Sequence, residues 1–154
     1  RNHRQTSTHV VQFAEISADE HIHTKTGFPT GSILYYIQRV RYLDGKALIL
    51  DINMFLKSQV PGLTPEIAEG SIYDYIEKEL GMQIITSKRT MTVEHTTQVD
   101  EKYLELKDYN CLAVVTNQTY NADGIMFEYT QSRHRPDFFR FQETATRKHR
   151  QETQ

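Results

Sequence analysis

The chain has 154 residues, the size of one domain with a substantial hydrophobic core. Its 18 Lys and Arg residues are nearly balanced by 20 Asp and Glu residues, which argues against a protein whose main role is to coat nucleic acid or an anionic membrane. The single cysteine, Cys111, excludes an internal disulfide framework and a cysteine-based zinc site. No apolar run reaches the ~20 residues that span a bilayer, and no signal segment opens the chain, so we expect a cytoplasmic globular domain.

The first thirty residues carry weak local signals. Residues 1–8 are polar and are expected to fray. A few apolar side chains that follow favour a short helix or turn against the core: Val10, Val11, Phe13 and Ile16. The polar residues 21–26 predict a loop, and the run Gly27-Phe28-Pro29-Thr30-Gly31 breaks any regular element.

A strand hairpin gives the strongest signal in the sequence. Residues 32–43 and 47–56 are rich in Ile, Leu and other strand-forming residues, and the Asp44-Gly45 pair between them is typical of a hairpin turn. Pro61-Gly62 then stops the chain. Further on, Ser71 with Asp74 three residues later predicts the start of a helix, whose apolar residues recur at helical spacing until Gly81 ends it.

The second half of the chain alternates between strands and a short helix. In chain order we expect a strand over 82–98, a helix over 100–107 capped by Asp100, a strand over 111–120, a turn over 121–124, a strand over 125–133 and, after Pro136, a last strand over 138–141. The charged tail from Thr144 is expected to be solvated. Strands joined mostly by hairpins predict an α+β fold, a mostly antiparallel sheet with flanking helices. Neither GxGxxG nor GxxxxGK[ST], the phosphate-binding loops, is present.

Two arginines of the predicted hairpin are the first candidates for a site. Arg39 and Arg41 share one face of a strand, about 7 Å apart, because side chains alternate along a strand. Guanidinium groups so close repel unless a negative group lies between them, and their planar forks suit a phosphate or carboxylate. The ordinary alternative is two solvated arginines on an open sheet face. Asp51 joins this face only if the hairpin is bulged; it is then a sugar-hydroxyl acceptor or an ion-pair partner for Arg39, and otherwise a surface charge.

The remaining polar candidates carry weaker signals. The N–H groups beside Ser71 can bind an anion, although a purely structural cap is the default interpretation. Tyr73 is more often a core or rim aromatic than a ligand contact. The histidines are scattered and lack the partners that a metal site needs: His21, His23, His95 and His134. Cys111 heads an apolar run and is expected to be a buried hydrophobic residue rather than a nucleophile. We therefore expect no metal and no cofactor.

Five motifs follow one another between Gly27 and Phe141. They are Val40-Arg41-Tyr42-Leu43-Asp44-Gly45, Pro61-Gly62-Leu63 with Gly70-Ser71-Ile72-Tyr73, Arg89-Thr90-Met91-Thr92-Val93-Glu94, Tyr120-Asn121-Ala122-Asp123-Gly124, and Phe127-Glu128-Tyr129-Thr130 with Phe139-Arg140-Phe141. In this order they resemble the motifs R-x-R-x-x-D-G, PGL…GSLY, R-x-T-I-E and Y-x-x-DG…VEYS…YRF of the UTRA domain. This domain is the C-terminal, effector-binding half of GntR-family, HutC-type transcription regulators.

The resemblance implies a chorismate-lyase-like fold and a homodimer formed by the sheet and its edges. It implies that residues 1–154 are one effector-binding and dimerisation domain of a bacterial transcriptional repressor. The winged helix-turn-helix domain that binds operator DNA would precede it and is absent here, in keeping with a chain that begins at Arg1 rather than at Met. The implied effector is a phosphorylated sugar, with trehalose 6-phosphate as the specific expectation.

The same resemblance assigns roles to seven residues. Arg39, Arg41 and Ser71 would hold the phosphate, and Asp51, Tyr73, Glu128 and His134 would line the sugar end. Asp51 is shorter than the glutamate often found there, and His134 stands where many relatives have a tyrosine, so the departures fall at the sugar end. The alternative function is a lyase-like enzyme acting on a small anionic substrate, with Glu128 or His134 as its acid or base. A dimerisation module without a ligand is a further alternative.

Overall fold

The computed structural model describes residues 5–147, which fold into an antiparallel sheet of six strands in the order β1-β2-β3-β6-β5-β4. The strands are β1 (Thr6–Ser17), β2 (Ile33–Leu43), β3 (Lys46–Leu56), β4 (Ile84–His95), β5 (Cys111–Asn121) and β6 (Met126–His134). The helices are α1 (Glu20–Thr26), α2 (Pro65–Glu69), α3 (Ile72–Asp74), the π-helix η1 (Tyr75–Glu79), α4 (Gln98–Tyr103) and the 3₁₀-helix η2 (Pro136–Phe138). The expected α+β class with an antiparallel sheet is confirmed.

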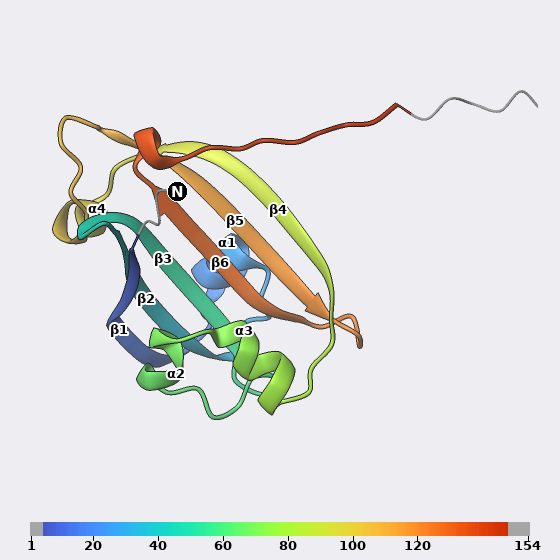
Figure 1. Ribbon diagram of the computed structural model, residues 1–154. Helices are drawn as coiled ribbons and strands as arrows, with labels where there is room; N and C mark the ends of the chain where they lie inside the picture. Colours follow the sequence, from blue (N-terminus) through green and yellow to red (C-terminus); the bar gives the residue numbers. More distant parts are fainter. Residues whose placement is uncertain (1–4, 148–154) are drawn as a thin grey trace, which may run out of the picture.

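Helices cover both faces of the sheet, because strand alternation turns apolar side chains to each side. Figure 1 looks onto the face that carries α2 and α3, with α1 behind the sheet. On the near face, Tyr35, Ile37 and Phe55 pack against Ile72 and Ile76 of α3 and η1. The far face has two apolar clusters, one around Leu104 after α4 and one around Phe28 after α1. Within residues 5–147, no helix has the length and apolar character needed to cross a bilayer.

The first strand corrects two expectations. Residues 6–17 form β1, so the short helix or turn expected near Val10 is wrong, as is fraying of residues 6–8; residues 1–4 lie outside the described part of the chain. The ladder with β2 shifts between Val10 and Gln12, which leaves Val11 as a bulge. A bulge interrupts the alternation of buried and exposed side chains, and this interruption hides a strand from pattern reasoning.

The expected loop over 21–26 is instead the short helix α1. Asp19 caps its start by accepting a 2.8 Å hydrogen bond from the backbone N–H of Ile22. Gly27 ends the helix with a left-handed φ of 91°, a conformation that favours glycine. Ile22 contributes an apolar side chain to the far-face packing, so the seven-residue helix depends on its caps more than on an apolar stripe.

The helices of the near face start as the sequence predicts, but differ in length and number. Ser71 is the N-cap of α3 and accepts a 3.2 Å hydrogen bond from the backbone N–H of Asp74. The helix continues as the π-helix η1, with Gly81 just beyond it. Helix α2 is not predicted from the sequence. Thr64 caps it, and its first residue is a proline.

The second half of the chain contains two further corrections. Thr97, not Asp100, caps α4; Asp100 is the third helical residue and its carboxylate accepts from the Thr97 N–H at 2.8 Å. The last strand expected over 138–141 is wrong, because Pro136 begins η2 and residues 139–147 have no regular structure. The ring of Phe139 packs 5.2 Å from that of His134 instead of extending the ladder. Residues 144–147 are exposed, and the rest of the tail lies outside the described residues.

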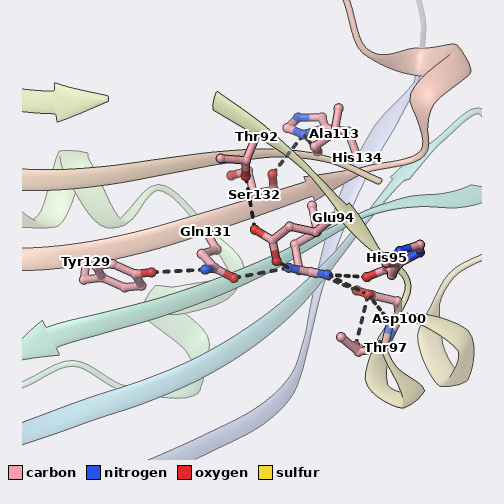
Figure 2. Close-up of polar contacts among 11 residues, drawn as sticks. Thr92, Glu94, His95, Thr97, Asp100, Ala113, Tyr129, Gln131, Ser132 and His134 are labelled. Atoms are coloured by element: carbon pink, nitrogen blue, oxygen red, sulfur yellow. Dashed lines mark hydrogen bonds and ion pairs between the residues drawn. The ribbon is translucent and has the colours of Figure 1, made fainter. Parts of the chain in front are cut away.

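A buried charge cluster joins α4 to the far face of the sheet. Arg133 of β6 donates to both carboxylate oxygens of Asp100, at 2.8 and 2.9 Å, and to Glu94 of β4 at 3.0 Å. Figure 2 shows the three side chains that surround the Arg133 guanidinium group: Asp100 from α4, Glu94 from β4 and Gln131 from β6. Asp100 is fully buried, whereas the Glu94 side chain is 40% exposed, so the charge of Arg133 is balanced mainly by Asp100.

Candidate functional site

A cavity of about 270 Å³ lies between the near face of the sheet and the start of α3. Strands β2, β3, β5 and β6 form its floor, and the α2–α3 junction forms its wall. The lining residues are Arg39, Arg41, Asp51, Asn53, Phe55, Gly70, Ser71, Ile72, Tyr73, Asn117, Glu128, Thr130 and Ser132. Six of the seven candidate residues from the sequence therefore surround one cavity, and His134 is the exception.

Asp51 lies between the two arginines. Its Oδ2 is 2.9 Å from Arg41 Nε and 3.5 Å from Arg39 Nη2, and its Oδ1 accepts from Arg41 Nη2 at 3.2 Å. The Asp51 side chain is 5% exposed, so it is an ion-pair partner for both arginines and not a surface charge. The negative group that two close guanidinium groups require is thus supplied by the protein itself.

The hairpin geometry explains why Asp51 reaches this face. Asp44 and Gly45 both have positive φ, 51° and 80°, as a tight two-residue turn requires. Such a turn alone would place Asp51 on the opposite face. The β2–β3 register shifts between Arg41 and Tyr42, and this bulge brings Asp51 opposite Arg39. The bulge therefore lies in the strands, next to the arginines, and not in the turn.

Arg39 uses all three of its nitrogen positions within the protein. Nε donates to Asn53 Oδ1 at 3.0 Å, Nη1 donates to the Ala68 carbonyl oxygen at 3.3 Å, and Nη2 contacts Asp51. Burial lowers the pKa of Arg39, although Asp51 opposes this change. The Arg39 side chain is 16% exposed and that of Arg41 is 37% exposed. Arg41 is the more open of the two positive charges.

Tyr73 and Glu128 face each other at the other end of the cavity. Tyr73 Oη donates to Glu128 Oε1 at 2.7 Å, and Thr119 Oγ1 donates to the same oxygen at 3.1 Å. Glu128 is 2% exposed, and its burial raises the pKa of the carboxyl group against the opposing effect of these donors. Burial also raises the pKa of Tyr73, and the adjacent Glu128 adds to this change. Ser71, the cap of α3, lines the same cavity.

Four polar lining residues were missed by the sequence analysis: Asn53, Asn117, Thr130 and Ser132. Thr130 is opposite Asn53 in one ladder and opposite Asn117 in the next, so the three side chains meet across adjacent strands. Asn53 Nδ2 donates to Thr130 Oγ1 at 3.0 Å. One local signal was available, because Asn53 follows Asp51 by two residues and shares its face. The other three depend on pairings between distant strands.

His134 lies on the near face, beyond the cavity lining. Its Nδ1 is 3.0 Å from the Ser132 carbonyl and 3.3 Å from that of Ala113, a contact visible in Figure 2. Burial lowers the pKa of His134, and the positive charge of Arg41 lowers it further. His134 therefore interacts electrostatically with Arg41 but does not line the cavity.

The other chemical candidates do not assemble into a site. Among residues 5–147, no group of three or more His, Cys, Asp or Glu side chains is arranged to hold a metal ion. Cys111 is half-buried at the start of β5 and is not in a disulfide. The polar side chains of the cavity are suited to binding a ligand that carries both a negative group and hydroxyl groups.

The model of the UTRA domain family matches residues 1–140 of the chain. The chain belongs to this family. This UTRA domain is 38% identical over 144 residues to the HTH-type transcriptional regulator TreR of Bacillus subtilis (strain 168), across 94% of the chain and 60% of that protein. It is 25% identical over 146 residues to the mannosyl-D-glycerate transport/metabolism system repressor MngR of Escherichia coli (strain K12), across 95% of the chain and 61% of that protein. The chain thus spans about 60% of the length of these relatives.

Solved structures agree with this assignment. The effector-binding domain of the B. subtilis trehalose repressor TreR superposes with a TM-score of 0.85 at 37% identity, covering 93% of this chain and 99% of that chain. A GntR-family transcriptional regulator from Bacillus cereus superposes with a TM-score of 0.82 at 28% identity, covering 92% and 99% of the two chains. This UTRA domain is accordingly an effector-binding domain of the GntR-regulator type.

Proposed function

We propose that this UTRA domain senses a phosphorylated sugar for a transcriptional repressor, with trehalose 6-phosphate as the first ligand to test. The observation that carries the proposal is the guanidinium group of Arg41, which is 37% exposed and lines a cavity rich in hydroxyl-binding side chains. The similarity to TreR, named as a trehalose repressor, favours trehalose as the sugar.

The cavity lining offers two kinds of binding group. Arg41, Arg39 and the N-cap residue Ser71 would bind the phosphate. Amide, hydroxyl and carboxyl groups of the same lining would bind the sugar hydroxyls: Asn53, Thr130, Asn117, Tyr73 and Glu128. Asp51 can also accept a hydrogen bond from a hydroxyl group. His134 does not line the cavity and its pKa is lowered, so it contributes neither a ligand contact nor a positive charge to this proposal.

The regulatory part of the proposal extends beyond this domain. We propose that an N-terminal winged helix-turn-helix domain accompanies this domain in the whole protein, because TreR is named an HTH-type regulator and this chain spans 60% of it. The protein would work as a cytoplasmic homodimer that touches operator DNA through that domain. Ligand binding would change operator occupancy only if the ligand binds two dimer states with different affinities.

A panel of ligands tests the proposal directly. Thermal shift and calorimetry should show binding of trehalose 6-phosphate, weaker binding of glucose 6-phosphate and N-acetylglucosamine 6-phosphate, and little binding of free trehalose. Arg41→Ala should abolish the response and lower the melting temperature, because the buried Asp51 loses its closest ionic partner. Arg140→Ala is the control. Arg140 is exposed, does not line the cavity, and donates a hydrogen bond to Gln142. Equal responses to trehalose and its phosphate, or normal binding by Arg41→Ala, would contradict the proposal.

A lyase-like enzyme is the second candidate, and one observation favours it. A buried carboxyl group with a raised pKa, such as Glu128, is a common feature of general acids in active sites. Incubation of the domain with each ligand of the panel, followed by mass analysis of the ligand, separates the two functions. A sensor returns the ligand unchanged, whereas an enzyme returns a product. If no ligand of any class shifts the melting temperature, a pure dimerisation module becomes the better explanation.

A further inference from the structure

The near face of the sheet carries exposed apolar side chains on its edge strand β4. Arg89 Nε donates to Asn117 of the cavity lining, so the Arg89 side chain lies on the near face. Met91 and Val93 follow at two-residue spacing and share this face. Met91 is 42% exposed and Val93 is 76% exposed. Figure 1 shows α2 and α3 at the other end of this face, away from the end of β4 and the start of β5.

The strand registers align these residues with their neighbours in two rows. The rows across β6, β5 and β4 are His134–Ala113–Val93 and Ser132–Val115–Met91. We call Ala113, Val115, Met91 and Val93 the apolar strip. Ser132 lines the cavity, so the strip borders the candidate site. Adjacent exposed apolar side chains form a surface on which another segment can pack.

The C-terminal segment already touches one end of the first row. The ring of Phe139 lies 5.2 Å from that of His134, which places residue 139 on the near face. Residues 139–147 have no regular structure, and Phe141 is 55% exposed. Figure 1 shows this segment leaving η2 and extending away from the strands. An unpacked aromatic ring therefore lies two residues from a point where the segment is fixed to the face.

Phe141 is within reach of the strip. Neighbouring strands are about 4.8 Å apart, so Val93 on β4 is about 10 Å from β6 across the sheet. Two extended residues span about 7 Å, and the aromatic side chain covers the remaining distance. Phe141 can therefore contact Val93 and Met91 while Phe139 remains on His134.

Charge favours the same placement. Arg89 is exposed, and within residues 5–147 its side chain has one hydrogen-bond partner, Asn117 at 3.2 Å. Glu143 is exposed and has no ion-pair partner in the described part of the chain. Glu143 follows Phe141 by two residues, and Arg89 precedes Met91 by two. An extended segment that places Phe141 on Met91, running antiparallel to β4, therefore brings Glu143 to Arg89.

We propose that residues 139–147 form a strap that closes over the apolar strip, with Phe141 on Val93 and Met91, and Glu143 paired with Arg89. The partner of the strip is thus the C-terminal segment of the same chain. Because Arg89 contacts Asn117 of the cavity lining, the closed strap borders the cavity. The inference concerns the segment and β4, and it holds whatever ligand the cavity binds.

A tryptophan probe tests closure of the strap. The chain contains no tryptophan, so Phe141→Trp introduces a single fluorescent probe. Its quenching by acrylamide should be about threefold weaker than in Phe141→Trp/Val93→Ser, because packing on apolar side chains removes the ring from water. Phe141→Trp/Lys88→Ser is the matched control, since Lys88 is exposed and pairs with Gln118, which contacts α1 on the far face. The control should behave as Phe141→Trp, and equal quenching in all three variants would overturn the inference.

A charge swap tests the ion pair. Arg89→Glu in the Phe141→Trp background should increase quenching, because it places two negative charges together, and the addition of Glu143→Arg should restore protection. Both effects should fade in about 1 M salt, where the screening length is about 3 Å. Failure of the double change to restore protection at low salt would overturn the pairing of Glu143 with Arg89.

The alternative occupant of the strip is the C-terminal segment of a second copy. Phe141→Trp/Val93→Ser mixed with excess wild type, which has no tryptophan, separates the two arrangements. Protection of the probe in this mixture would show that the strip binds the segment of another molecule, and would overturn closure within one chain. Unchanged quenching in the mixture, with protection of Phe141→Trp that does not depend on protein concentration, would support the strap.

Discussion

Arg41 Nε lies 2.9 Å from Asp51 Oδ2, so the most open positive charge of the cavity is already paired with a buried carboxylate. Asp51 therefore competes with any external anion for the same guanidinium group. The pair also reduces the net charge that a phosphate meets, because one negative charge offsets one of the two arginines. Binding strength in this cavity depends on the carboxylate as much as on the arginines.

Asp51→Asn should strengthen binding of inorganic phosphate about tenfold, because removal of one nearby negative charge is worth at least ~1.4 kcal/mol at a half-buried site. The same change should lower the melting temperature, since buried Arg39 loses an ionic partner. Asp44→Asn is the control, a substitution of the same kind in the hairpin turn outside the cavity. Calorimetry measures the affinity of both variants for phosphate. Weaker phosphate binding by Asp51→Asn would show that Asp51 does not compete with phosphate for Arg41.

Tyr73→Phe should destabilise the domain by about 1–3 kcal/mol, because the buried Glu128 loses a hydrogen-bond donor. Urea unfolding measures this change. Tyr75→Phe is the matched control. Tyr75 is the first residue of η1, and its hydroxyl donates to the carbonyl oxygen of the exposed Pro61 at 2.6 Å. We expect the control to cost less than about 1 kcal/mol, since water can replace that donor. Equal costs would mean that Glu128 is not stabilised by Tyr73.

Glu128→Gln should raise the melting temperature at pH 7 to 8. Burial raises the pKa of Glu128 in the folded state, so the folded state loses stability as pH increases through that pKa. A neutral glutamine avoids this loss. The difference between variant and wild type should therefore shrink as pH falls toward about 4.3, where the glutamate is protonated in the unfolded chain as well. Glu77→Gln, at an exposed glutamate of η1, is the control for the change of a carboxylate to an amide. A Glu128→Gln advantage that grows in acid would contradict this prediction.

The charge cluster on the far face gives a stability prediction that is independent of the cavity. Asp100→Asn should cost about 3–5 kcal/mol, because it leaves the buried Arg133 without its main counter-charge. Glu94→Gln removes a partner whose side chain is 40% exposed and should cost less than about 1 kcal/mol. Denaturant unfolding of the two variants measures the difference. Similar costs would show that the charge of Arg133 is shared equally between Asp100 and Glu94.

The sequence predicts the parts of this fold that have local causes. The Asp44-Gly45 turn determines the β2–β3 hairpin, and Ser71 determines the start of α3. β1 was not predictable by periodicity, because the bulge at Val11 breaks its alternation. α1 has little apolar periodicity, and its capping interactions are not apparent from a hydrophobicity pattern.

The candidate site shows the same division between local and distant causes. Strand alternation places Arg39 and Arg41 on one face without any knowledge of the fold. The position of Asp51 depends on a β-bulge that no residue type in the hairpin predicts. Thr130 meets Asn53 only through the pairing of β3 with β6, strands that are far apart in sequence. Such registers are set by packing of the whole sheet, which a single sequence does not display.

The start of β1 is fastened to the hairpin that bears the arginines. Gln5 and Asp44 exchange two hydrogen bonds, from the Asp44 N–H to the Gln5 carbonyl at 2.8 Å and from the Gln5 N–H to Asp44 Oδ1 at 3.0 Å. The turn that follows β2 is therefore hydrogen-bonded to Gln5, the first residue that the structure describes. Because both hydrogen bonds use backbone N–H groups, a displacement of this turn, three residues after Arg41, would also displace Gln5 and the start of β1.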